Sequence, residues 1–300
     1  WDYLHIKNWK LFSIKFMNFS TKSKIFFASI LNRPLVFFFE KVLDSKIVRV
    51  KRNSLFWELD LTEGIDFSIF IFWFFERDTS KAIKRLVNSG DVVIDIGANI
   101  GAHTLPISKL IGDKGKVYAV EPTNYAYKKL INNLLINDIF SKNVQADQII
   151  LTNGNNKGVI HNLYSSWPLT SKNVDQKHNV HQGVLRTISG ATEVSLDNYL
   201  LNNNITSLDL IKLDVDGNEL GVLSGAKNVL KEMKPVIIME LAPEQYDNEN
   251  DFMEVIKILV LAGYNFYSLN EKFKYPNAPL DLVGYIPKNG SINVVARVDC

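Results

Sequence analysis

The sequence predicts an α/β protein with a mostly parallel, doubly wound sheet, preceded by a small N-terminal extension. Three observations support this fold class. Residues 79–300 alternate between short apolar runs and segments with helical spacing, the order that gives parallel strands joined by crossover helices. Residues 92–96 are β-branched apart from Asp95, which is typical of a strand buried on both faces. A turn with glycine at positions 97 and 101 follows that run directly.

Residues 1–78 are predicted to form the extension, starting with one or two helices as far as about residue 50. Two short segments are predicted to pair as a hairpin, because apolar and acidic residues alternate in the second of them: residues 47–50 and 55–61. The nearly unbroken apolar run 67–75 predicts a buried segment.

The main domain is predicted to span residues 79–300. Its predicted strands are residues 92–96, 116–120, 144–151, 208–215, 236–241, 265–269 and 293–298, and its predicted helices include residues 79–88, 125–137, 221–233 and 252–261. Because no helix is predicted between the last two strands, we expect them to form an antiparallel pair at one edge of a seven-stranded sheet. The crossover helices are then expected to cover both faces of the sheet.

Charge is distributed unevenly along the chain. The first 52 residues hold eleven basic and three acidic residues, a net charge of +8, and the remaining residues carry −6. Such a basic, aromatic-rich segment predicts either peripheral contact with an anionic membrane or, more simply, a solvated helical appendage packed on the main domain. Cys300 is the only cysteine, which indicates a reducing compartment such as the cytoplasm. No apolar run reaches the roughly 18 to 20 residues of a membrane-spanning helix.

The turn after the first strand of the main domain is the first candidate for a ligand site. Gly97 and Gly101 allow a sharp turn and a close approach of a ligand to the backbone, and the free N–H groups at the start of the next helix favour a carboxylate or phosphate. A dinucleotide-binding turn would have glycine at position 99, where this chain has Asn99. The turn therefore favours a ligand with a carboxylate tail, such as S-adenosylmethionine, whose ammonium group Asp95 would hold directly or through water. The simpler alternative is a purely structural turn.

Glu121 ends the second strand, 24 positions after Gly97. An acid near this spacing binds the ribose hydroxyls of nucleotide ligands in related folds, and a carboxylate can accept hydrogen bonds from both hydroxyls of a cis-diol. The alternative is a surface acid that caps the next helix. Coupled to the glycine turn, the spacing favours ribose binding.

Four acidic residues lie at or just after the ends of the fourth and fifth strands: Asp214, Asp216, Glu219 and Glu240. Since the ends of parallel strands meet at one edge, these carboxylates are expected to converge. They would act as a general base, bind a polar substrate or hold a divalent cation. Asp214 is the first candidate for the base, whereas Glu219 has the simpler alternative of stabilising a helix N-terminus. The spacing matches no known cation-binding loop, so no metal site is predicted.

His103 lies just after the glycine turn and would be a second candidate for the base if its side chain faces the cavity. A single histidine at a helix start is more often a local hydrogen-bonding residue. Both interpretations of His103 therefore stay open.

Several segments together resemble the FkbM family of methyltransferases. They occur in the family's order: residues 91–101, 117–122, 195–200, 210–219, 222–226 and 235–240. The resemblance implies a class I, Rossmann-like methyltransferase fold, S-adenosylmethionine as cofactor, and O-methylation of a hydroxyl on a sugar, glycan or secondary metabolite.

The resemblance also assigns residues to roles. It places Asp95, Gly97, Asn99 and Glu121 at cofactor-contact positions, and Asp214 and Glu219 in the family's acidic motif after the fourth strand. Two departures stand out: Gln148, at the expected adenine contact, where asparagine is commoner, and Asp216, where glutamate is commoner.

Two other functions remain as alternatives. A nicotinamide-dependent oxidoreductase on a related fold is disfavoured by Asn99. A binding module that has lost its chemistry would bind the cofactor without transferring a methyl group. Nucleic acid is not expected as a partner, because the main domain is acidic and the fourth strand ends in Asp-Val-Asp-Gly instead of the Asn-Pro-Pro-Tyr type of motif found in many amino-methylating enzymes.

Overall fold

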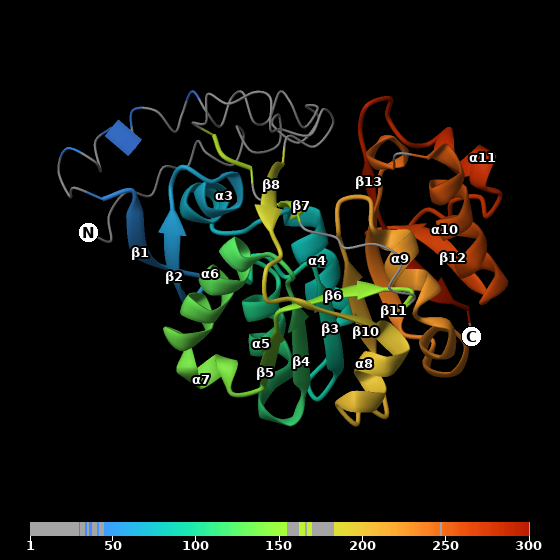
Figure 1. Cartoon of the computed structure of the whole chain (residues 1–300), viewed down its shortest axis with the longest axis horizontal. Coiled ribbons are helices and arrows are strands. Elements are labelled where there is room, and N and C mark those ends of the chain that lie inside the picture. Colours follow the sequence, from blue (N-terminus) through green and yellow to red (C-terminus); the bar gives the residue numbers. More distant parts are fainter. Residues whose placement is uncertain are drawn as a thin grey trace.

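A computed structural model describes residues 45–154, 162–165, 167–169, 183–246 and 248–299, together with residues 30, 34, 36, 37 and 41 (Figure 1). Its centre is a seven-stranded sheet. In spatial order the strands are β12 (Tyr264–Ser268), β13 (Ile292–Val298), β11 (Val236–Leu241), β10 (Leu210–Leu213), β3 (Val92–Ile96), β4 (Lys116–Val120) and β5 (Val144–Asp147). The last five strands in this order are parallel, while β13 runs antiparallel to both of its neighbours. The predicted fold class, with its antiparallel edge pair, is confirmed.

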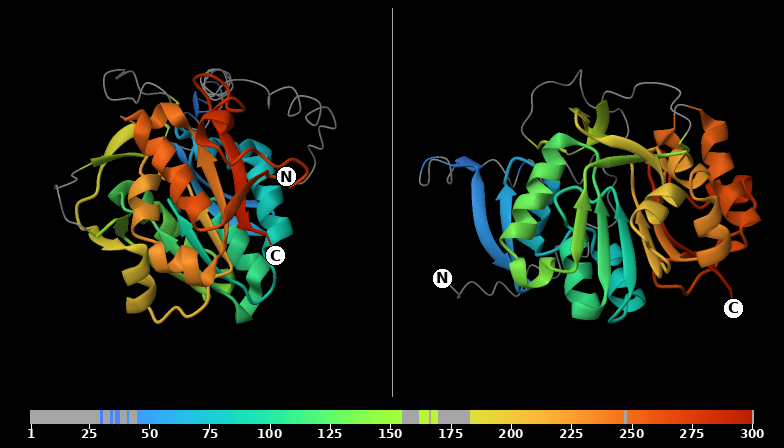
Figure 2. Two further views of the ribbon diagram at one scale, coloured as in Figure 1. Left: turned by 90° about the vertical axis from the view of Figure 1, so that its right-hand side faces the viewer. Right: turned by 60° about the horizontal axis from the view of Figure 1, so that its bottom comes forward.

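Helices cover both faces of this sheet, as predicted (Figure 2). On one face lie α4 (Arg77–Leu86), α5 (Thr104–Ile111) and α6 (Asn124–Leu135), which pack on Val93, Val117 and Ala119. On the other lie α8 (Leu196–Asn202), α9 (Glu219–Ser224), the π-helical turn η3 (Val229–Met233) and α10 (Glu249–Leu261). The shorter helices are η1 (Gly112–Lys114), α7 (Asp138–Ser141), η4 (Pro243–Gln245) and α11 (Pro279–Val283).

The segment predicted as one strand at residues 144–151 is two strands. After β5 the chain turns at Gln148, and β6 (Ile149–Thr152) leaves the main sheet to pair in parallel with β9 (Thr192–Ser195). Apolar residues occur on both sides of the turn, partly buried in β5 and buried in β6, so hydrophobicity alone does not reveal the change of direction.

The helix predicted at residues 221–233 is also interrupted. It ends at Ser224 because the backbone of Gly225 packs against β6, where an added Cβ would lie only 2.1 Å from the carbonyl oxygen of Thr152. A further difference is α11, which lies between the last two strands where no helix was predicted.

The N-terminal extension contains the predicted hairpin, formed by β1 (Ile47–Arg52) and β2 (Leu55–Asp60), followed by α3 (Gly64–Phe72). Leu59 and Ile69 are buried with Leu105 and Leu130 of the main domain in one hydrophobic cluster. Within the apolar run 67–75 the burial is uneven, since the side chain of Trp73 is 53% exposed. Most of the residues predicted as N-terminal helices lie outside the described residues. The basic segment considered for membrane contact is described only from residue 45 onward and at residues 30, 34, 36, 37 and 41.

A second hairpin, β7 (Asn162–Ser165) with β8 (Val184–Thr187), lies near the extension. None of the described helices is long and apolar enough to cross a bilayer.

Candidate active site

The carboxyl ends of β3, β4 and β10 meet at a cleft between the main domain and the extension. The cleft contains about 790 Å³ of space between protein atoms, part of it open to solvent. Residues following the three strands form its floor, and Phe75, Leu163 and Trp167 are among the side chains that close over it. Its position at the strand ends is where open α/β sheets bind ligands.

The glycine turn brings β3 and β10 into contact at the floor of the cleft. Gly97 has φ +78°, and an added Cβ there would lie 1.9 Å from the carbonyl oxygen of Asp214, so only glycine fits. Asn99 also has a positive φ of 50° and lines the cleft. Gly101 does not line it; this glycine faces the side chain of Leu130.

Glu121 points toward the glycine turn, as its predicted role requires. Its Oε2 accepts a hydrogen bond from the backbone N–H of Asn99 at 3.0 Å, and its Oε1 accepts from the N–H and hydroxyl of Thr123. The side chain lines the cleft and is almost entirely buried. Burial raises the pKa of Glu121, although the hydrogen bonds from Thr123 and Asn99 oppose this rise.

Lys212 connects the acids at the floor of the cleft. Its Nζ lies 3.1 Å from Asp214 Oδ2 and 3.8 Å from Asp95 Oδ1, and donates a hydrogen bond to the carbonyl oxygen of Gly97 at 3.2 Å. Burial alone would lower the pKa of Lys212, but the nearby charges of Asp214, Asp95 and Glu76 outweigh it and raise that pKa. The ammonium group is therefore a permanent positive charge in the cleft. A lysine inside an apolar strand is a sequence signal for a buried, paired charge, but Lys212 was not predicted as a site residue.

Asp95 lies behind the cleft instead of lining it. The side chain is fully buried, and its Oδ2 accepts a hydrogen bond from the hydroxyl of Thr104 at 2.6 Å. Lys212 separates Asp95 from Asp214. In this structure Asp95 therefore positions Lys212 and the start of α5, and direct contact with a ligand stays a prediction.

His103 lines the cleft on its extension side. The imidazole is 3% exposed, and its Nε2 lies 3.5 Å from Glu76 Oε2. The ring of Phe75 is 5.8 Å from that of His103 and stacks on Trp167 at 5.9 Å between centroids. Burial by itself would raise the pKa of Glu76, but the contacts with His103 and the charge of Lys212 prevail and lower it. The carboxylate of Glu76 is thus kept ionised beside the imidazole.

Glu76, Phe75 and Trp167 were not predicted as site residues. The first two belong to the extension and Trp167 lies between β7 and β8 of the second hairpin, far from the glycine turn along the chain. Only the folding of the extension onto α5 and α6 places them at the cleft.

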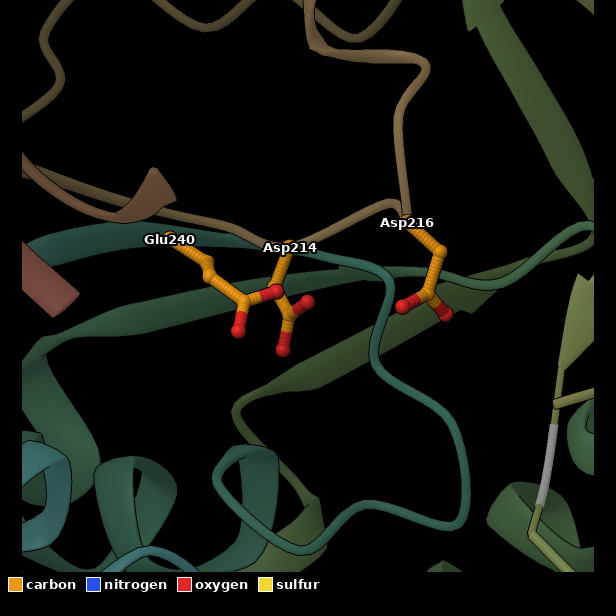
Figure 3. A group of neighbouring side chains, drawn as sticks. All are labelled: Asp214, Asp216 and Glu240. Atoms are coloured by element: carbon orange, nitrogen blue, oxygen red, sulfur yellow. The ribbon is translucent and has the colours of Figure 1, made fainter. Parts of the chain in front are cut away.

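Three of the predicted acids form a cluster beside Lys212. Asp214, Asp216 and Glu240 place carboxylate oxygens within 4.8 Å of one another (Figure 3), and Asp214 and Asp216 line the cleft. Glu240 accepts hydrogen bonds from Ser291 and Gln245. Burial and the neighbouring carboxylates raise the pKa of Asp216, and they raise that of Glu240 to about 8. Carboxylates this close can share a proton or a cation.

Glu219 and Gln148 lie outside the cleft and hold its loops. Glu219 Oε1 accepts hydrogen bonds from the N–H groups of Val215 and Gly217, and its Oε2 accepts from the hydroxyl of Tyr246 at 2.6 Å. The amide of Gln148 donates to backbone or side-chain oxygens around the loop after Glu121. The apolar residues 149–151 line the cleft in the place predicted for Gln148.

The sheet order, the reversed β13 and the glycine turn facing a strand-end acid define a class I methyltransferase fold. The model of the methyltransferase FkbM domain matches residues 95–266, and the chain belongs to this family. The family resemblance found in the sequence is thereby confirmed, and family membership supports S-adenosylmethionine as the cofactor.

Individual relatives are distant. The chain is 24% identical over 163 residues to the hexuronic acid methyltransferase AglP of Haloferax volcanii, a match that covers 54% of this chain and 61% of that protein. Among solved structures, a methyltransferase FkbM from Methylobacillus flagellatus KT has a TM-score of 0.42 at 17% identity, covering 69% of this chain and 43% of that one. TYW2 of M. jannaschii in complex with AdoMet has a TM-score of 0.40 at 16% identity, covering 84% of each chain.

Proposed function

We propose that this protein transfers the methyl group of S-adenosylmethionine to a hydroxyl oxygen of a sugar. The observation that carries the proposal is the hydrogen bond from the N–H of Asn99 to Glu121. This bond holds a strand-end acid against the glycine turn, and both line the same cleft. The family to which the chain belongs supports methyl transfer. The distant relative that acts on hexuronic acid supports a sugar as acceptor.

The residues present fit the cofactor. Glu121 Oε2 accepts one hydrogen bond, from Asn99, and keeps capacity to accept from a ribose hydroxyl, whereas Oε1 already accepts two from Thr123. The apolar side chains of residues 149–151 provide a wall for the adenine ring. Gly97 and Asn99 line the part of the cleft where the methionine part would lie. The carboxylate of Asp214 faces the cleft and would supply negative charge near a sulfonium.

The bound cofactor would supply an electrophilic methyl group. The chain's residues would orient the acceptor hydroxyl and accept its proton as the new C–O bond forms and the S–CH₃ bond breaks. Orientation of two reactants in an attack geometry contributes on the order of 7 to 11 kcal/mol. Asp214 is the first candidate for the base, and its carboxylate is held in place by Lys212. His103, oriented by Glu76, is the second candidate.

A sugar acceptor fits the chemistry of the remaining walls. The stacked rings of Phe75 and Trp167 offer flat apolar surfaces, which suit the C–H face of a pyranose. Asp216 and Asp214 offer acceptors for its hydroxyl groups. The acids at the floor of the cleft and the rings of Phe75 and Trp167 that form its roof together favour a neutral polyol ring at the point of methyl transfer.

The test is incubation of the protein with labelled S-adenosylmethionine and a panel of monosaccharides, uronic acids, phenols and RNA. We expect label in the saccharides, in a product that releases methanol or methyl iodide under ether-cleaving conditions. Labelling of RNA or of an amine would contradict the proposal. Thermal-shift titration with S-adenosylhomocysteine and with NAD separates this function from an oxidoreductase. Binding of S-adenosylhomocysteine with no product from any acceptor would favour the inactive binding module.

A further inference from the structure

A second cavity lies on the other side of His103 from the cofactor cleft. It contains about 1460 Å³ of space, part of it open to solvent, between the first hairpin, α3, α4 and α5. Phe75, Ala102 and His103 line both this cavity and the cofactor cleft. The two cavities therefore share a boundary made of these three residues.

The charge of the second cavity is opposite to that of the cofactor cleft. Arg52, Lys84 and Lys109 line it from three different elements, and the described lining residues include no carboxylate. The cofactor cleft is instead lined by three acids, Glu121, Asp214 and Asp216, and by one cation, Lys212. Three like charges around a concave surface repel each other, and a bound anion offsets this repulsion.

Two of these cations are fixed in position by the protein. Arg52 donates a hydrogen bond from Nε to the carbonyl oxygen of Phe70 at 3.0 Å, and its guanidinium lies 5.2 Å from the ring centroid of Trp73. Lys109 donates to the carbonyl oxygen of Asn53 at 3.1 Å. Each contact uses only part of the donor capacity of the side chain. Both groups can therefore donate to a ligand without leaving their places.

Lys84 differs from the other two. It is exposed on α4, and its ammonium group makes no ion pair or side-chain hydrogen bond with the residues that the structure describes. Trp73, which contacts Arg52, and Phe74 also line the cavity. Cations set among aromatic rings match a ligand that has both an anionic group and a C–H surface.

We propose that the second cavity binds the anionic part of the methyl acceptor, a saccharide that carries a carboxylate or a phosphate group. The acceptor would straddle the boundary at His103, with its anionic group among Arg52, Lys84 and Lys109 and the hydroxyl to be methylated in the cofactor cleft. This assignment rests on the proposed function, since it takes the second cavity to be part of the acceptor site.

The experiment measures binding by calorimetry, so that it does not depend on turnover. Glucuronate, glucose 6-phosphate and inorganic phosphate are the probes, with glucose as the neutral control. We expect both charged sugars to bind at least about tenfold more tightly than glucose, and their affinity to fall as salt is added. Preference for one of the two charged sugars identifies the anionic group. Equal affinity for glucose and the charged sugars would overturn the proposal.

Matched variants locate the site. Lys84→Glu should weaken binding of the charged sugars at least about tenfold, while Lys128→Glu, the same charge reversal on the exposed face of α6 outside the cavity, should leave it unchanged. Equal effects of the two variants would contradict the assigned cavity. Affinity for S-adenosylhomocysteine, measured on the same samples, should not change in either variant. Failure of the unmodified protein to bind S-adenosylhomocysteine would refute the proposed function, whatever the result for the anions.

Discussion

Lys212 and Asp95 lie side by side on adjacent parallel strands, with the ammonium nitrogen 3.8 Å from the nearer carboxylate oxygen and both side chains buried. Asp214 lies on the other side of the same ammonium group at 3.1 Å. One lysine thus balances two acids, of which Asp95 faces the interior and Asp214 the cleft. The pair couples the stability of the sheet to the geometry of the candidate active site.

Replacement of Lys212 by methionine should therefore destabilise the protein. The variant leaves Asp95 and Asp214 without their counter-charge, and breaking a buried pair in this way costs about 3 to 5 kcal/mol. Urea denaturation followed by circular dichroism measures the loss. Lys231→Met is the control, because this exposed lysine forms an ion pair with exposed Glu232, so its replacement should change the stability little. Similar stability of the two variants would mean that the charge of Lys212 does not stabilise the folded protein.

Glu121→Gln should weaken the binding of S-adenosylhomocysteine about 10- to 100-fold. The amide oxygen can still accept from Asn99, while the NH₂ group replaces the oxygen that accepts from Thr123 and the charged acceptor for the ribose is lost. Isothermal titration calorimetry measures the change. Glu244→Gln serves as control, since Glu244 is exposed and does not line the cleft. An affinity equal to that of the unmodified protein would exclude a ribose contact at Glu121.

The sequence predicted the floor of the cleft better than its roof. Gly97, Asn99, Glu121 and Asp214 follow buried strands whose pattern is local, and the carboxyl ends of parallel strands necessarily meet at one edge. The pairing of Lys212 with Asp95 depends on β10 lying next to β3, which no local pattern specifies.

The roof depends on contacts between distant segments. Phe75 and Trp167 stack although 91 positions separate them, and neither lies in a motif. The turn at Gln148 was missed for a related reason, because β5 and β6 both contain apolar residues and only their pairing partners show where the chain changes direction. Contacts between distant segments determine these features, and the periodicity of a single sequence does not reveal such contacts.

The identity of the base can be decided by comparing two variants. If Asp214 accepts the proton, Asp214→Asn should bind S-adenosylhomocysteine within a few fold of normal and lose about 10²- to 10⁴-fold in kcat, whereas His103→Asn should retain most of its turnover. Asparagine preserves an oxygen for Lys212, so the cleft should stay intact. The opposite pattern would assign the base to His103, and Glu76→Gln should then shift the pH dependence of kcat. Normal turnover of Asp214→Asn would refute its catalytic role.

The stability of the fold should decrease between about pH 4.5 and 7 through Glu63. Burial raises the pKa of this carboxyl from 4.5 to about 7, even though Lys129 lies nearby. A carboxyl with a raised pKa holds its proton more tightly in the folded than in the unfolded chain, so its contribution is greatest below pH 4.5 and is lost as the pH rises through 7. Thermal denaturation across this range should show a smaller decrease for Glu63→Gln than for the unmodified protein. Parallel curves for the two proteins would show that Glu63 does not titrate in this way.

Treatment with EDTA should leave methyl transfer unchanged. The cluster of Asp214, Asp216 and Glu240 has the oxygen ligands of a cation site, but the ammonium of Lys212 already lies 3.1 Å from Asp214 and would repel a divalent ion there. The raised pKa values of Asp216 and Glu240 also favour a shared proton over two free carboxylates. The measurement compares initial rates before and after EDTA and after addition of Mg²⁺, Mn²⁺ or Ca²⁺. Loss of activity that one of these ions restores would instead make the acid cluster a cation site, with Lys212 displaced from Asp214 when the ion binds.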